Sequence, residues 1–160
     1  MKIKLNSTMG MPSQDMVANV AAALNLTLPV GYLQRLAEIN GAVPESNIFD
    51  VADRNNSGVN QFIPFDRVPY EVGLLEQHGV ETFLPIAYAE GGNYVCVATK
   101  GLDEGKVFFL DHEIPGLAAL TKVAASIEDF FQMLRPFTSE DIKLKPGQVK
   151  RAWIDPDLLK

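Results

Sequence analysis

The chain is poor in the residues that build covalent frameworks and membrane spans. Its 160 residues include one cysteine, Cys96, which excludes an internal disulfide framework. No apolar run approaches the roughly 20 residues that a membrane-spanning helix needs. Residues 1–13 carry two lysines but no continuous apolar stretch, which argues against a secretory signal. Together these absences predict a cytoplasmic protein.

The common signatures of catalysis are missing as well. The sequence contains neither a GxSxG nor an HExxH motif. Its few histidines and single cysteine cannot build a closed structural metal site, so we expect no metal and no cofactor. Cys96 lies in an apolar segment without an evident base or cation, which predicts a buried, inert thiol. These features favour a protein that is not an enzyme.

The residues that are present predict one globular domain of helices, then strands, then a helix and a tail. The composition is 47% hydrophobic and 21% charged, as is usual for such domains. Helical spacing, serine caps and glycine stops define four helices. The first helix begins after Ser13. The second runs from Leu28-Pro29 to Asn40-Gly41, the third from Pro69 to His78, and the fourth from Ser126 to Leu134. His78 would stabilise the negative end of its helix.

The stretch LPIAYAEGGNYVCVATKG, residues 84–101, places two glycines between two strand-like runs. A phosphate-binding loop needs its glycines at the start of a helix, whose N–H groups and dipole hold the anion. Residues 93–99 are instead rich in aromatic and β-branched side chains, and Glu90 would repel a phosphate. We therefore predict that Gly91 and Gly92 form the corner of a β-hairpin.

Further strands follow from the same kind of pattern. Residues 94–98 and 107–110 are apolar on both faces, so we expect them in the middle of a sheet, joined through residues 101–105. Residues 53–60, DRNNSGVN, are predicted from their composition to be a loop. Residues 62–65, FIPF, would then form a short strand or extended segment.

The formal net charge of −6 is unevenly distributed. Residues 143–160 hold five basic and two acidic groups, and residues 1–12 hold two lysines. The body, residues 13–142, therefore has 18 acids and 7 bases, a net charge of −11. Such a field repels nucleic acid and speeds encounter with a basic partner. A purely solubilising role for the excess of acids stays open.

One short cluster, Asp111-His112-Glu113, resembles a metal or acid–base site. On an extended strand neighbouring side chains point to opposite faces, so His112 would point away from the two acids. Two acids could share a metal, but no second histidine or cysteine stands at ligand-like spacing. We interpret the cluster as a charged strand end that enters a loop. A small hydrolase that uses Asp111 and Glu113 is an alternative.

Four segments occur in an order and at spacings that resemble a known family. They are LPVGYLQRLAEINGA, FLPIAYAEGGNYVCVATKG, GKVFFLDHE and VAASIEDFFQML. This ordered set is similar to the SUKH superfamily, in particular the domain type named after the yeast cell-wall assembly regulator. The similarity covers roughly residues 20 to 135. We assign residues 13–138 to a SUKH-like domain and residues 139–160 to a basic C-terminal extension.

The resemblance implies an α+β fold in a single domain, with a central mixed or antiparallel sheet and flanking N- and C-terminal helices. It also implies a non-enzymatic protein of the bacterial immunity branch, which binds and neutralises a toxin, often a nuclease. Such a toxin domain would be basic, in keeping with the acidic body. A regulatory or scaffold protein of the cell-wall regulator type is the other alternative.

The candidate contact surface consists of acids that we expect to be exposed. Those between the second helix and the following loop have no obvious basic compensation in the sequence, and the others stand at the predicted hairpin turns. They are Glu38, Glu45, Asp50, Asp53, Glu90, Asp103 and Glu104. A merely solvated rim would have the same composition.

Overall fold

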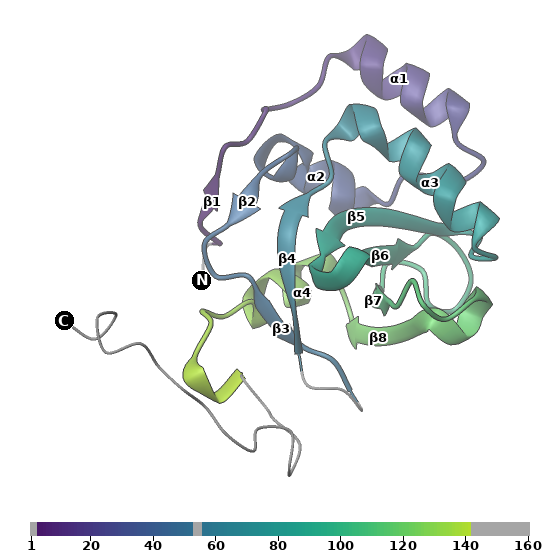
Figure 1. Cartoon of the computed structure of the whole chain (residues 1–160). Helices are drawn as coiled ribbons and strands as arrows, with labels where there is room; N and C mark the ends of the chain where they lie inside the picture. Colours follow the sequence, from purple (N-terminus) through teal and green to yellow (C-terminus); the bar gives the residue numbers. More distant parts are fainter. Residues whose placement is uncertain (1–2, 53–55, 142–160) are drawn as a thin grey trace, which may run out of the picture.

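A six-stranded sheet forms the centre of the computed structural model, which describes residues 3–52 and 56–141 (Figure 1). Each strand pairs antiparallel with the next along the chain, in the order β3-β4-β5-β6-β7-β8. The strands are β3 (Ile48–Asp50), β4 (Asn56–Phe62), β5 (Phe83–Ala89), β6 (Asn93–Ala98), β7 (Val107–Leu110) and β8 (Leu120–Ala124). A separate pair joins β1 (Leu5–Asn6) to β2 (Val43–Pro44). The α+β fold in one domain is confirmed, with the antiparallel form of the sheet.

All four predicted helices are present. They are α1 (Gln14–Ala23), α2 (Val30–Ile39), α3 (Val68–Gln77) and α4 (Ile127–Met133). The hydroxyls of Ser13 and Ser126 accept N–H bonds at the starts of α1 and α4, as expected of N-caps. After α2 the chain turns at Gly41, whose φ of +70° suits glycine.

The helices cover both faces of the sheet. Successive residues of a strand point to opposite faces, so neighbouring residues contact different helices. On one face, Cys96 of β6 is fully buried in a cluster with Leu75 of α3. On the other, Val97 lies close to the starts of α2 and α4. Phe49 and Phe130 meet edge to face there, with ring centroids 5.3 Å apart. The expected burial of the Cys96 thiol is confirmed, and this burial raises its pKa, which disfavours the reactive thiolate.

The predicted loop at residues 53–60 is wrong for its second half, because β4 begins at Asn56. Ser57, Gly58 and Val59 are buried between β3 and β5, and Val59 pairs with Ala89. Pairing with strands on both sides satisfies the backbone here, and this outweighs the polar, turn-like composition. Residues 62–65, predicted as a short strand or extended segment, are not a strand of their own: Phe62 is the last residue of β4, and Phe65 begins the 3-10 turn η1 (Phe65–Arg67).

The hairpin at the two glycines is confirmed. Strands β5 and β6 are joined by the short turn η2 (Glu90–Gly92), in which Gly91 and Gly92 have φ angles of +75° and +81°. Strand β6 follows directly, so no helix begins there. Strands β6 and β7 lie inside the sheet, as predicted. Within the described residues, no helix is long and apolar enough to cross a membrane.

Candidate interaction surface

The predicted acids are divided between the two ends of the sheet. Strand register places Asp50, the η2 turn and residues 111–113 together at one end, which we call the η2 end. Asp103 and Glu104, in the turn between β6 and β7, lie at the opposite end, the Glu104 end, beside the start of α4. These two groups therefore cannot belong to one small contact patch.

The remaining candidates lie elsewhere. Glu38 is in the last turn of α2, and Glu45 follows β2 directly. Asp50 is the last residue of β3 rather than part of a loop. Asp53 lies outside the described residues.

The acids between the second helix and the following loop were expected to lack basic partners, and this is wrong for Glu38, Glu45 and Asp50. Asp103, at a hairpin turn, is paired as well. The carboxylates of Glu38, Glu45, Asp50 and Asp103 form ion pairs with Arg35, Lys4, Arg135 and Lys106, at 3.0, 3.0, 3.1 and 2.9 Å. Sequence distance hid the pairs of Glu45 and Asp50, since Lys4 and Arg135 are far from them in the chain. Arg35 and Lys106 stand only three residues from Glu38 and Asp103, and this local signal was overlooked. Within the described residues, Glu90 and Glu104 form no ion pair.

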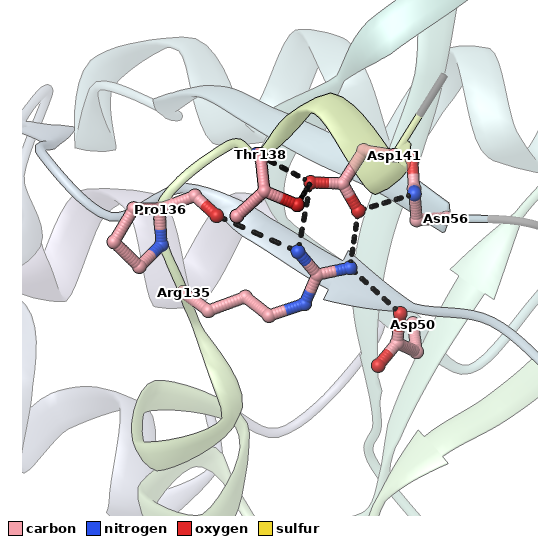
Figure 2. Close-up of polar contacts among 6 residues, drawn as sticks. All are labelled: Asp50, Asn56, Arg135, Pro136, Thr138 and Asp141. Atoms are coloured by element: carbon pink, nitrogen blue, oxygen red, sulfur yellow. Dashed lines mark hydrogen bonds and ion pairs between the residues drawn. The ribbon is translucent and has the colours of Figure 1, made fainter. Parts of the chain in front are cut away.

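Arg135 is the centre of a polar cluster that ties the end of the domain to the β3–β4 hairpin (Figure 2). Its guanidinium donates to both carboxylate oxygens of Asp141, at 2.9 and 2.5 Å, and to Asp50 at 3.1 Å. Asp141 also accepts from Asn56 at 2.9 Å and from the backbone N–H of Thr138 at 2.7 Å. The Arg135 guanidinium, and after it the backbone N–H of Thr138, hold the pKa of Asp141 well below its usual range.

The backbone of Arg135 has a second role. Its N–H and C=O both bond to Ile48, each at 2.9 Å, so this residue pairs with the outer edge of β3. Sequence reasoning did not find this cluster, because its members are separated by up to about 90 residues and only the fold brings them together.

Asp111, His112 and Glu113 do not lie on an extended strand, so the geometry predicted for them is wrong. Strand β7 ends at Leu110, and the carboxylate of Asp111 turns back to accept the N–H of Glu113 at 3.0 Å. His112 contacts Asn93 instead of either acid. No group of three or more potential metal ligands occurs within the described residues. The interpretation as a strand end that enters a loop agrees with this geometry.

A buried carboxylate, Glu71 of α3, joins this helix to the sheet. One oxygen accepts the hydroxyl of Tyr88 at 2.7 Å and the other that of Tyr94 at 2.6 Å. Arg67 approaches the same carboxylate at 3.9 Å. The sequence analysis missed Glu71, although it stands at the second position of the apolar series Val68, Glu71, Val72, Leu75, which is a signal of a buried acid.

The family follows from comparison with known proteins. A family model described as SMI1 / KNR4 family (SUKH-1) matches residues 11–133, well over half of the chain. The chain belongs to the SMI1/KNR4 family (SUKH-1). The resemblance seen in the sequence is thereby confirmed. No curated protein matches the chain.

Membership in SUKH-1 supports a non-enzymatic module that works through contacts between proteins. The SUKH-1 match includes all four helices and the whole sheet, and it ends at the last residue of α4. Arg135 and Asp141 lie beyond it. The polar cluster around Arg135 therefore connects the SUKH-1 domain to the residues that follow it.

Proposed function

We propose that this chain is a cytoplasmic immunity protein that binds a basic toxin domain, such as a nuclease, and neutralises it by direct contact. The observation that carries the proposal is the net charge of −11 on residues 13–142 of a SUKH-1 protein. An acidic surface of this size attracts a basic domain over long range and selects against nucleic acid itself.

We place the contact surface at the η2 end of the sheet. Asp50 is 71% exposed there, and Glu90 has no ion-pair partner among the described residues. The backbone of this end is held by the β5–β6 hairpin and by the cluster around Arg135, so a partner would meet a preformed surface. Glu38, Glu45, Asp103 and Glu104 would then act through the long-range field rather than through contact.

The experiment takes its toxin domain from a large secreted protein encoded next to this chain, which the proposal expects to exist. Cells that express the toxin should survive only when this chain is co-expressed, and the two purified proteins should form a stable complex in size-exclusion chromatography. Protection without complex formation would contradict direct neutralisation. Absence of both would overturn the proposed function.

A further inference from the structure

Both histidines of the chain line one surface pocket at the η2 end. The pocket has a volume of about 220 Å³ and lies between α3 and strands β6 and β7. Leu74, Leu75 and Leu110 form its apolar wall. His78, His112 and Tyr94 supply its polar groups. We call it the two-histidine pocket.

Hydrogen bonds fix which nitrogen of His78 carries the proton in the neutral ring. Nε2 lies 2.6 Å from the backbone oxygen of Ile114. A carbonyl oxygen only accepts, so Nε2 must donate. The other nitrogen, Nδ1, is then an acceptor, and no described residue donates to it.

His112 is fixed in the complementary way. Its Nδ1 lies 2.8 Å from the side-chain oxygen of Asn93, which also accepts the backbone N–H of His112 at 3.0 Å. The backbone donor identifies this atom as the amide oxygen, so Nδ1 donates and Nε2 is the acceptor. The ring lies over Gly92, where a side chain would meet its Cε1 atom at 3.4 Å.

Tyr94 adds a third acceptor. Its hydroxyl proton is directed to Glu71 at 2.6 Å, so the oxygen can only accept a further hydrogen bond. Behind it stands the Glu71 carboxylate, whose charge Arg67 balances only from 3.9 Å. None of the described residues that line the pocket is a lysine or an arginine. The pocket thus combines acceptors, apolar surface and nearby negative charge.

We propose that the two-histidine pocket binds an arginine side chain of the protein partner. The guanidinium group has five N–H donors in a plane, enough to reach two imidazole nitrogens at once, and its face stacks on aromatic rings. The aliphatic stem packs on the leucines. The identity of the partner rests on the proposed function, whereas the preference for arginine rests on the pocket alone.

The test titrates N-acetyl-arginine amide into the full-length chain and follows the aromatic and backbone resonances by NMR. We expect saturable shifts at His78, His112 and Tyr94 with a dissociation constant of about 1–10 mM, as a ligand of this size allows. N-acetyl-citrulline amide, which has the same shape without the charge, should bind at least about tenfold more weakly. N-acetyl-lysine amide should fall between the two, since it has the charge without the planar fork.

Two variants complete the design. His112→Ala removes one acceptor from an exposed position and should abolish the arginine shifts. Leu102→Ala, at a fully exposed position in the β6–β7 turn at the Glu104 end, should leave them unchanged. Equal binding of the arginine and citrulline amides, or shifts confined to other surfaces, would overturn the proposal. If the parent chain binds the arginine amide but does not protect cells from the toxin, the toxin-neutralising function is contradicted and the proposed arginine site is not.

Discussion

Arg135 and Asp141 form a bidentate ion pair in which the carboxylate is almost buried and the guanidinium is about one-third exposed. The side chain of Asp141 is 4% exposed, whereas Asp50, which bonds to the same guanidinium, is 71% exposed. An ion pair contributes more where water is excluded. The two carboxylates are therefore a matched pair for experiment.

Asp141→Asn should lower the melting temperature clearly at pH 7, and Asp50→Asn should change it little. Because the pKa of Asp141 is lowered in the folded state, its contribution is present above the unfolded value of about 3.9 and is lost as the pH falls further. Thermal unfolding between pH 5 and pH 2 should show a steeper loss for the parent than for Asp141→Asn. Parallel curves would contradict the assigned role.

Truncation after Phe137 should reduce stability, because it removes Thr138 and Asp141 from the cluster around Arg135. Truncation after Asp141 is the control, since it keeps every described contact of the cluster. Calorimetry of the two shortened chains separates them. Trp153 lies outside the described residues, and from the sequence we predict that it packs on the domain rather than inserting into a partner. A large loss of stability in the chain truncated after Asp141, which also lacks Trp153, would support this packing.

Tyr94→Phe should destabilise the protein by about 1–3 kcal/mol, because one oxygen of the buried Glu71 would lose its donor. Tyr88→Phe should act in the same direction. Burial, and then the hydrogen bond to Glu71, raises the pKa of Tyr88 to about 12. A raised pKa in the folded state means that stability is lost as the pH rises from about 10 to 12. Denaturant unfolding in this range should show a shallower decline for Tyr88→Phe.

Glu90→Lys at the η2 end should slow association with the toxin by roughly tenfold at low ionic strength, and salt should reduce the difference. Its matched control is Glu104→Lys, which makes the same charge change at the opposite end. Both acids are exposed and without ion pairs in the described residues, so both variants should fold. Association rates measured by stopped flow show whether the toxin binds at the η2 end or at the Glu104 end. An equal effect of the two variants would show that only net charge matters.

Changing Glu45, Asp50 and Asp53 together to lysine reverses three charges of the candidate surface, but two of these acids form ion pairs. Lysines at 45 and 50 would face Lys4 and Arg135, so lost protection could come from lost stability. Melting temperature must therefore be measured beside protection for this triple variant. A variant that stays folded and still protects would remove these acids from the contact surface.

Removal of metals with a chelator should leave the melting temperature and toxin binding unchanged. Asp111 accepts the backbone N–H of Glu113 and His112 contacts Asn93, and no group of three or more potential metal ligands occurs within the described residues. Elemental analysis of protein purified without chelator checks this. Stoichiometric zinc or calcium would reopen the hydrolase alternative for Asp111 and Glu113.

The elements that the sequence predicted correctly are those set by local chemistry. Ser13 and Ser126 cap their helices, and Gly91 and Gly92 turn a hairpin, because each depends on a few adjacent residues. The first half of strand β4 was missed because its residues form a strand only by pairing with the neighbouring strands β3 and β5. The ion pairs of Glu45 and Asp50 were missed for the same reason, since their partners are distant in sequence. Glu71 left a local signal that was overlooked, as did the pairs Arg35–Glu38 and Asp103–Lys106, whose members are three residues apart.

Pairing of the Arg135 backbone with β3 also bears on self-association. Endless edge-to-edge growth of sheets requires two open edges on every copy. In the six-stranded sheet, the outer edge of β3 is bridged by Arg135 at Ile48, whereas the described residues place no bridge on the outer edge of β8. Contact between two β8 strands would end growth at a pair of molecules, and Lys122 at the middle of β8 would face its own copy in a symmetric pairing. Edge-to-edge association of this sheet would therefore favour a pair of molecules over a fibre.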